Sequence, residues 1–254
     1  MRFGKILNAL GPVVALAIAA GLSGCNNADI KLNGKEGVPL SELDLSGEAP
    51  SEVVLLGPDA VDIRDGESLA IEVEGSDEAR ARMRFVLEDG SLGILREKSN
   101  RNESGIATVI ITMPAPRKLT IAGSGRMTSA SVSDSPEIHV LGSGTLELPS
   151  VAAGKMDVNI AGSGTLRAAG TAETLDLNVL GSGSADLARL KVTKADVNVA
   201  GSGDTVFASD GEVEANIMGS GDVTVRGSAR CRVKTMGSGT LTCERAPEDY
   251  DEAA

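Results

Sequence analysis

The pattern of apolar and polar residues between residues 119 and 243 consists of short alternating segments that repeat along the chain. In all but the last segment two apolar residues enclose a polar one, and in most copies a second alternating stretch follows after a turn. Alternation with a period of two predicts β-strands that bury one face. The enclosing pairs are Leu119 and Ile121, Ile138 and Val140, Val158 and Ile160, Leu177 and Val179, Val197 and Val199, Ala215 and Ile217, and, less regularly, Val233 and Thr235.

A Gly-Ser-Gly motif separates the two stretches, and successive copies begin 19, 20, 19, 20, 18 and 18 residues apart. A unit of this length is too short for strands, a helix and a core of its own. At about 3.3 Å per residue it can trace one closed coil that stacks on its neighbours. We therefore predict an all-β fold, a single-stranded parallel β-helix, and the usual hand of such connections makes it right-handed.

The glycines of the motif predict a corner at the same place in every coil. Such a corner needs a positive φ or a close approach between backbones, and glycine permits both because it has no Cβ atom. A flexible Gly/Ser linker is the alternative, but linkers are not flanked by phased valines and isoleucines. The corner glycines are Gly123, Gly125, Gly142, Gly144, Gly162, Gly164, Gly181, Gly183, Gly201, Gly203, Gly219, Gly221, Gly237 and Gly239.

Residues 51–116 predict less regular coils of the same domain, with short strands near 53–56, 61–63, 69–73 and 106–113. The segment 82–95 predicts a hairpin, because Asp89-Gly90 is a strong two-residue turn signal. We place the domain at residues 51–245. Residues 25–50 are expected to form a tether, and residues 246–254 an acidic disordered tail.

The order of these segments resembles the head GIN domain of putative auto-transporter adhesins. The resemblance rests on Val-Asp-Ile-Arg-Asp-Gly at 61–66, Leu-Glu-Asp-Gly-Ser-Leu-Gly-Ile-Leu at 87–95, a strand that ends in proline, and serial copies of Ile-Ala-Gly-Ser-Gly. It covers about residues 51–243 and implies a β-helix-like fold on an envelope protein. The chain departs from the family's name in its expected anchor, which is a lipid and not an auto-transporter domain.

The first 25 residues predict export. Arg2 and Lys5 precede an apolar run, and Leu22-Ser23-Gly24-Cys25 follows it, which is typical of a secretory signal at residues 1–24. A transmembrane anchor is the alternative, but the uninterrupted run 13–20 is too short to span a bilayer. Leu-Ser-Gly-Cys resembles the lipobox of bacterial lipoproteins, which implies cleavage before Cys25 and acylation of its thiol. Asn26 then implies the outer membrane, facing the periplasm or the cell surface.

Charge and composition exclude nucleic acid as a partner. The formal net charge is −12, and removal of the signal takes away Arg2 and Lys5 and so changes it to −14. Phosphate backbones require a basic surface. The expected partners are the membrane, through the lipid anchor, and an envelope or cell-surface component. We expect no cofactor.

The two cysteines that remain, Cys231 and Cys243, form an even pair in an exported chain and predict a disulfide. Two unpaired buried thiols are the alternative. A zinc site is not expected, because the one histidine, His139, is distant in sequence.

An enzyme of the polysaccharide lyase or hydrolase type is the second functional hypothesis. Such enzymes need paired carboxylates or an assisted base, and usually aromatic surface. Here aromatic residues make up only 2% of the chain. Calcium could bind Asp204 and Asp222, which follow two corners one coil apart. We expect the chain to be a structural or binding module without an active site.

Two outward columns of polar residues are the candidate ligand or cation face, one residue per coil. Five carboxylates lie five residues before the corners, and asparagines lie three residues before four of them. The alternative is a solubilising face on which the asparagines hydrogen-bond to one another. The columns are Glu137, Asp157, Asp176, Asp196 and Glu214, and Asn159, Asn178, Asn198 and Asn216.

Overall fold

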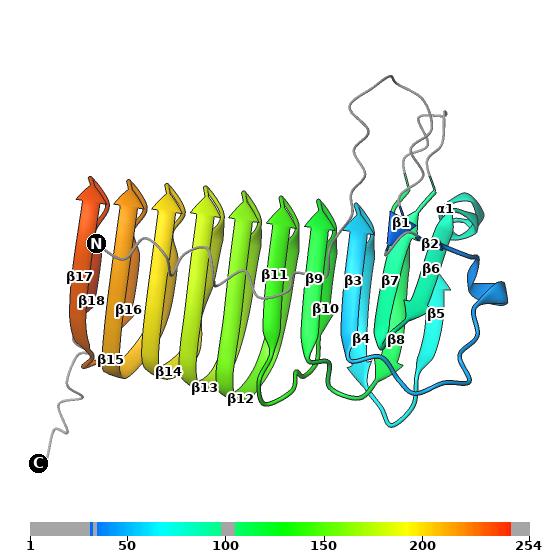
Figure 1. Ribbon diagram of the computed structural model, residues 1–254, viewed down its shortest axis with the longest axis horizontal. Coiled ribbons are helices and arrows are strands. Elements are labelled where there is room, and N and C mark those ends of the chain that lie inside the picture. Colours follow the sequence, from blue (N-terminus) through cyan, green and yellow to red (C-terminus); the bar gives the residue numbers. More distant parts are fainter. Residues whose placement is uncertain (1–30, 33–34, 98–104, 245–254) are drawn as a thin grey trace, which may run out of the picture.

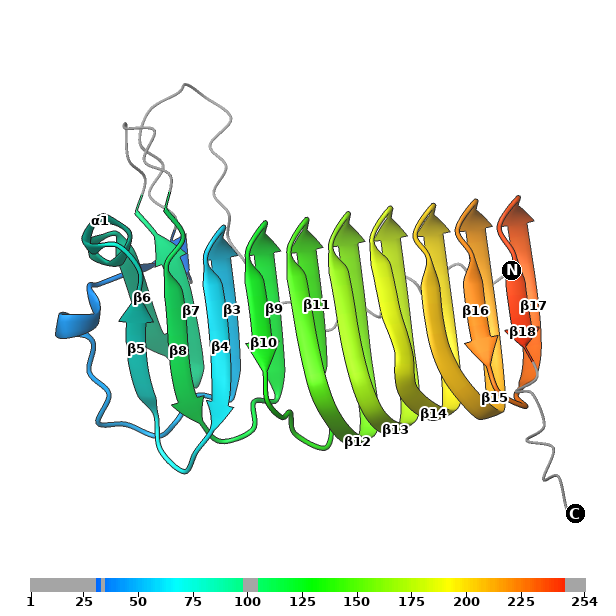
Figure 2. The same ribbon diagram turned by 180° about the vertical axis from the view of Figure 1, so that it is seen from behind.

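The computed structural model describes residues 31–32, 35–97 and 105–244 and confirms a right-handed parallel β-solenoid (Figures 1 and 2). Cys25 and residues 246–254 lie outside the described residues. No described helix is long and apolar enough to cross a membrane. The regular coils comprise β9 (Lys118–Gly123), β10 (Arg126–Ser129), β11 (Glu137–Gly142), β12 (Thr145–Gly162), β13 (Thr165–Gly181), β14 (Ser184–Gly201), β15 (Thr205–Gly219), β16 (Val223–Arg226), β17 (Arg230–Gly237) and β18 (Leu241–Glu244).

Each long strand bends and contributes to two faces of the solenoid. The beginning of β12 pairs with β10, and its end pairs with β11. Equivalent residues of successive coils lie side by side, as Asp157 does with Asp176 and Gly162 with Gly181. The repeat in the sequence is therefore a repeat in space, and every outward or inward position forms a column along the solenoid axis.

The interior is filled by these columns of apolar side chains. Ile138, Val158, Leu177 and Val197 belong to one column and are fully buried. Burying such a side chain contributes about 1.5–3 kcal/mol. Phe207 is a rare large residue in the repeats and stacks on Leu187 and Val225 inside the solenoid.

The N-terminal coils do not follow the order of the sequence. This part contains β3 (Glu52–Gly57), β4 (Ala60–Asp65), β5 (Ala70–Glu74), α1 (Asp77–Ala81), β6 (Met83–Glu88), β7 (Ser91–Arg96) and β8 (Thr108–Met113). Strand β3 pairs with β9 on one edge and with β7 on the other, so the first coil of the sequence is the second coil in space. Strands β5 and β6 pair antiparallel with β8 and β7 and close this end (Figures 1 and 2).

The predicted hairpin is present as β6 and β7, with Glu88 opposite Ser91. Asp89 and Gly90 both have a positive φ, 49° and 73°, as the two-residue turn requires.

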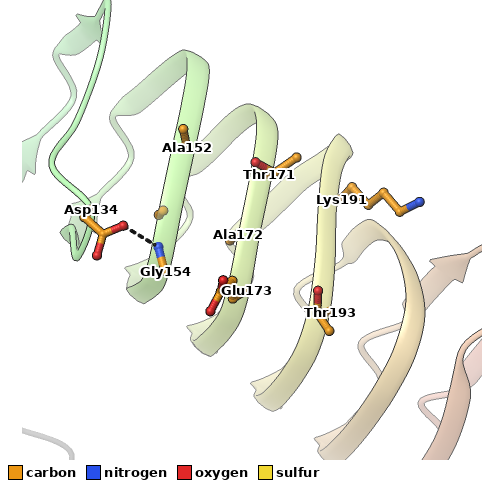
Figure 3. Close-up of a pocket in the computed structure, with 9 residues that line it drawn as sticks. Asp134, Ala152, Gly154, Thr171, Ala172, Glu173, Lys191 and Thr193 are labelled. Carbon is orange, nitrogen blue, oxygen red and sulfur yellow. Dashed lines mark hydrogen bonds between the residues drawn. The ribbon is translucent and has the colours of Figure 1, made fainter.

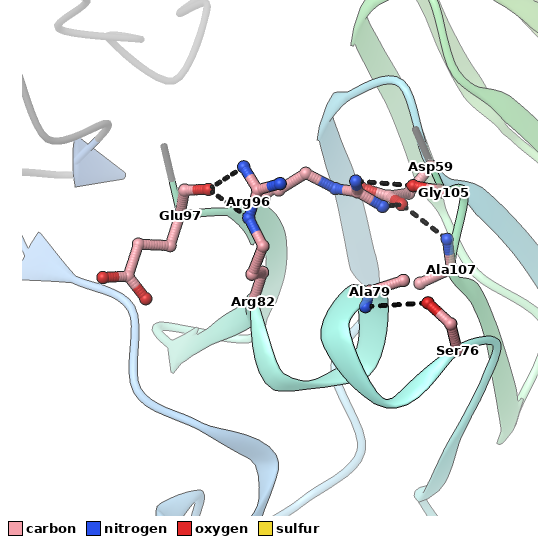
Figure 4. A network of polar contacts seen from close by, with 8 residues as sticks. All are labelled: Asp59, Ser76, Ala79, Arg82, Arg96, Glu97, Gly105 and Ala107. Atoms are coloured by element: carbon pink, nitrogen blue, oxygen red, sulfur yellow. Dashed lines mark hydrogen bonds and ion pairs between the residues drawn. The ribbon is translucent and has the colours of Figure 1, made fainter. Parts of the chain in front are cut away.

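A buried ion pair holds the reordered coils together (Figure 4). Asp59, which is 1% exposed, lies between β3 and β4, and Arg96 ends β7. The guanidinium donates two bonds to this carboxylate, one of 2.8 Å from Nε, and a third of 2.6 Å to the Gly105 carbonyl. The amide of Ala107 donates to Asp59 Oδ1 at 2.8 Å. One carboxylate therefore joins three segments of the chain, and its removal would leave the partly buried Arg96 without a counter-charge.

The predicted tether is partly a component of the domain. Strands β1 (Lys31–Leu32) and β2 (Lys35–Glu36) pair, and the short 3₁₀ helix Leu40–Glu42 follows. Val38 and Phe85 exchange backbone hydrogen bonds of 2.9 and 2.8 Å, while Leu43 and Leu45 pack against the core. Part of the segment predicted as a tether, residues 38–45, therefore contacts β6 and the core of the domain.

The C-terminal coil is joined across the interior by a disulfide between Cys231 of β17 and Cys243 of β18. Both cysteines occupy inward columns, beside Val213 and Val225 respectively. The disulfide therefore connects the two faces of a coil that no described coil covers.

Both glycines of a corner are needed, for different reasons. Gly162 has a φ of +117°, and a Cβ atom there would lie 2.5 Å from the Gly142 carbonyl oxygen. At Gly164 the φ is unremarkable, but a Cβ would lie 2.4 Å from Val140 Cγ1. The corner packs backbone directly on backbone, and the Ser163 amide donates a 2.8 Å hydrogen bond to the Gly142 carbonyl.

Substitution of corner glycines should separate these two effects. Gly57 has a φ of +132°, and a Cβ atom added there would have no neighbour within 4 Å, so Gly57→Ala should cost only the backbone strain, about 1–3 kcal/mol. Gly162→Ala adds a collision with a backbone oxygen and should cost clearly more. Thr165→Ala, which removes one hydroxyl contact of 3.2 Å with Ser184, should change stability by less than about 0.5 kcal/mol. Urea unfolding measures all three, and equal effects at Gly162 and Thr165 would contradict the corner's role.

Candidate binding face

The sheet face formed by β9, β11, the ends of β12 to β15, and β17 carries the residues predicted as a ligand or cation face. Its acidic column contains Glu137, Asp157, Asp176, Asp196 and Glu214, which lie in register on successive coils. Neighbouring coils are about 4.8 Å apart. A cation bounds the column at each end, because Lys118 is in register with Glu137 and Arg232 with Glu214.

Cations and amides also engage the carboxylates within the acidic column. Lys155 Nζ lies 2.9 Å from Asp157 Oδ1 and 3.1 Å from Asp176 Oδ2, and these two bonds raise the pKa of Lys155. Lys234 Nζ lies 2.7 Å from Glu214 Oε1. No group of three or more His, Cys, Asp or Glu side chains within residues 35–97 and 105–244 could hold a metal ion. The column is therefore a partly neutralised surface and gives no metal centre.

The two aspartates considered for calcium, Asp204 and Asp222, instead accept hydrogen bonds from the next coil. The Asp222 amide donates to Asp204 Oδ1 at 3.2 Å, and the Thr240 amide and hydroxyl donate to Asp222 Oδ1 at 3.0 and 2.7 Å. These carboxylates stabilise the stacking of corners.

The amide column contains Asn159, Asn178, Asn198 and Asn216 and forms a ladder of hydrogen bonds. The Nδ2 atoms of Asn178, Asn198 and Asn216 each donate to the Oδ1 of the asparagine in the preceding coil, at 3.2, 3.2 and 3.0 Å. His139 occupies the next position of this column, and its burial, together with the charge of Lys118, lowers its pKa. The ladder fixes the side chains and leaves one further acceptor and donor position on most amides for a partner.

A third column on the same face is apolar, and sequence reasoning missed it. The residues of this third column point outward beside the amide column. Although they are apolar, Leu180, Met218 and Met236 are 50%, 41% and 71% exposed. The signal was present, because an apolar residue directly precedes every Gly-Ser-Gly motif. The apolar column runs in register through Leu95, Leu56, Ala122, Leu141, Ala161, Leu180, Ala200, Met218 and Met236. Its first two members, Leu95 and Leu56, are buried in a small cluster with Val54 and Val86, so the exposed part lies over the later coils.

A shallow hollow of about 350 Å³ lies where β12, β13 and β14 bend (Figure 3). Small residues line it, with Asp134, Glu173 and Lys191 among them. Asp134 Oδ1 accepts a hydrogen bond of 3.0 Å from the Gly154 amide, and Lys191 lies 2.7 Å from Asp210. Lys191, and then the amide and hydroxyl of Ser228, hold the pKa of Asp210 at about 2. Two of its three charged side chains, Asp134 and Lys191, are therefore engaged with the protein itself.

Comparison with known proteins identifies the family of the repeats. The family model described as putative auto-transporter adhesin, head GIN domain, matches residues 49–229. No curated protein matches the chain.

Solved structures with the same fold include three from Bacteroides and Parabacteroides. A putative adhesin from Bacteroides fragilis NCTC 9343 has a TM-score of 0.71 and 19% identity, and the match covers 77% of this chain and 93% of that one. A putative lipid binding protein from Parabacteroides distasonis ATCC 8503 has a TM-score of 0.61 and 21% identity, with coverages of 77% and 93%. A putative adhesin from Parabacteroides merdae ATCC 43184 has a TM-score of 0.60 and 16% identity, and the match covers 77% of this chain and 92% of that one. At these identities the likeness shows the fold.

Asp196 is the carboxylate whose removal should stabilise the protein. Partial burial raises its pKa, and Asp176 and Glu214 raise it further, while a bond from Asn198 opposes them. A carboxyl group whose pKa is higher in the folded state than in the unfolded state makes the folded protein less stable as the pH rises above the usual aspartate pKa of about 3.9. Asp196→Asn should therefore raise the melting temperature at pH 7 and leave it unchanged at pH 3.

Asp157→Asn is the matched control, because it removes a partner of Lys155 and should give no gain at pH 7. Thermal unfolding followed by circular dichroism at constant ionic strength measures both variants. A gain for Asp196→Asn that persists at pH 3 would contradict an electrostatic cause.

Proposed function

The chain belongs to the family described as putative auto-transporter adhesin, head GIN domain, and from this premise we propose that it is a non-enzymatic binding module of the cell envelope. In this proposal Cys25 carries the lipid anchor, and the solenoid presents its acidic, amide and apolar columns to a partner on another molecule or cell-surface component.

The exposed apolar column is the observation that carries the binding role. Soluble proteins rarely expose a continuous row of apolar side chains, and such patches usually mark interaction sites. Leu180 and Met218 lie beside hydrogen-bonding amides of the same coils, so apolar and polar contacts are available to one partner. The parallel strands keep these groups at fixed spacing, which lowers the entropy lost on binding.

Anchoring is supported by the sequence of the first 25 residues. A basic start, an apolar run and Leu22-Ser23-Gly24-Cys25 are typical of a lipoprotein signal. Two or more acyl chains on one residue give stable attachment where one chain gives marginal attachment. The acidic domain would be held away from anionic head groups, so the lipid rather than the protein surface would make the membrane contact.

A carbohydrate-active enzyme remains the alternative, and the engaged carboxylates argue against it. Lys155 forms ion pairs with two carboxylates of the acidic column. Asp204 and Asp222 accept hydrogen bonds from backbone amides of the next coil. Scarce aromatic surface also disfavours stacking on sugar rings. Release of unsaturated or reducing products from acidic polysaccharides by residues 26–254 would favour the enzyme.

Cys25→Ala tests the anchor. Without the thiol no thioether can form with a lipid, so the variant should remain an unprocessed precursor and incorporate no labelled fatty acid, while the wild type incorporates it. Ser23→Thr offers a control that keeps the thiol. A wild-type protein that never acquires the label would show that the anchor assignment is wrong.

The double substitution Leu180→Ser and Met218→Ser tests the binding face. Both side chains are exposed, so folding should be nearly unaffected, whereas binding of residues 26–254 to immobilised envelope extract should fall at least about tenfold. Val206→Ser is the matched control, since Val206 points outward on the other face, in register with Asp186 and Thr224. Equal binding by all three proteins would exclude the apolar column as the contact surface.

A further inference from the structure

The methionines that the structure describes fall into two groups, which differ in their access to solvent. Two are exposed, Met218 at 41% and Met236 at 71%. Four are at most 1% exposed and belong to the core, and these are Met83, Met113, Met127 and Met156. Oxidants dissolved in water therefore reach two thioethers directly, whereas they reach the other four only when the core opens.

The two exposed methionines are neighbours in the apolar column. Strand β15 lies beside β17 at one end of the solenoid (Figure 1), and Met218 is in register with Met236. Successive coils are about 4.8 Å apart, so a small oxidant that reaches one of these side chains also reaches the other. In the two preceding coils the same position holds Leu180 and Ala200, which have no sulfur. Within the described coils, readily oxidised side chains are thus confined to one end of the column.

Oxidation of a thioether needs access to the sulfur and no acid–base group, because a thioether, unlike a thiol, has no proton to lose before it reacts. A sulfur lone pair attacks one oxygen of hydrogen peroxide, the O–O bond breaks as the S–O bond forms, and the second oxygen leaves as water after proton transfer. The sulfur loses two electrons and the peroxide gains two. Cys231 and Cys243 are joined to each other, so neither offers a thiol that competes for the peroxide.

We propose that Met218 and Met236 form a site of oxidative modification, at which peroxide converts the C-terminal end of the apolar column into polar surface. Methionine sulfoxide is a polar, chiral group in place of a flexible apolar one, and dedicated reductases restore the thioether. The modification itself follows from the exposure and the register of the two side chains. Its effect on a partner, which is weaker binding while the sulfoxides persist, rests on the binding role proposed above.

The fold should tolerate oxidation at these two positions. Both side chains are exposed, so the oxygen of a sulfoxide there is hydrated. At Met127 or Met156 the same oxygen would be buried among the apolar side chains of the core, which would destabilise the folded state. Leu180 lies two coils before Met218 and stays apolar. The modification therefore changes one end of the apolar column and leaves the core and the rest of the column as they were.

Limited treatment of residues 26–254 with hydrogen peroxide tests the site without a partner. Met156, Met218 and Met236 fall on three different tryptic peptides, so mass spectrometry follows each of them separately. Met218 and Met236 should gain one oxygen at least about tenfold faster than Met156. The melting temperature should stay unchanged, while retention on a hydrophobic-interaction column should fall. Equal rates at the three methionines, or unchanged retention after both exposed ones are oxidised, would overturn the proposal.

The double variant Met218→Leu and Met236→Leu is the matched control, because leucine keeps an apolar side chain of similar size and has no sulfur. Peroxide should change neither its retention nor its binding to immobilised envelope extract, whereas binding of the wild type should fall about tenfold. A fall of equal size in the variant would overturn the proposal, and so would undiminished binding by the oxidised wild type. An untreated protein that binds no envelope component would instead contradict the proposed binding role, and the retention measurement would still decide the modification.

Discussion

The stacking of corner backbones is the constraint on which the rest of the structure depends. At each Gly-Ser-Gly motif the carbonyl of one coil lies where a Cβ of the next would be, so that Gly181 and Gly201 tolerate no side chain toward Gly162 and Gly181. This contact fixes which residue begins the next strand of each coil. Because the side chains of a strand alternate, a fixed starting point decides which of them enter the core.

Because the register is fixed, a residue type that recurs at one position of the repeat forms a continuous column on one face of the solenoid. A single asparagine would be an ordinary surface residue, but four in register make the ladder from Asn159 to Asn216. Fixed register also places the aspartates of successive coils side by side. Their negative charges therefore repel one another. Lys155 offsets that repulsion for Asp157 and Asp176, and Asp196 has no such partner among the ion pairs of the described residues. The acidic column is thus uneven in its electrostatics although it is uniform in its sequence.

The regular coils could be predicted from the sequence because their determinants are local and repeated. Period-two alternation around Gly162 or Gly181 specifies strand, face and corner together. The order of the N-terminal coils could not be predicted in this way, because it depends on contacts between distant residues, above all Asp59 with Arg96. The apolar column was missed for another reason. Alternation marks Leu180 and Met218 as outward, and outward positions are expected to be polar unless a partner covers them.

For the binding role proposed above, the position of the apolar column narrows the kind of partner that would fit. The apolar column lies beside the amide column and two outward positions from the acidic column. Because the chain as a whole is acidic, an anionic lipid surface would be repelled along the whole solenoid. Leucine or methionine alternates with alanine from Leu141 to Met218, which gives ridges two coils apart, about 10 Å, with recesses between them. A rigid partner must match that spacing, whereas an extended chain that lies along the column can adapt to it. In that proposal, an extended, uncharged or basic chain with hydrogen-bonding groups along one side would satisfy the amide and apolar columns together, and a flat membrane would not.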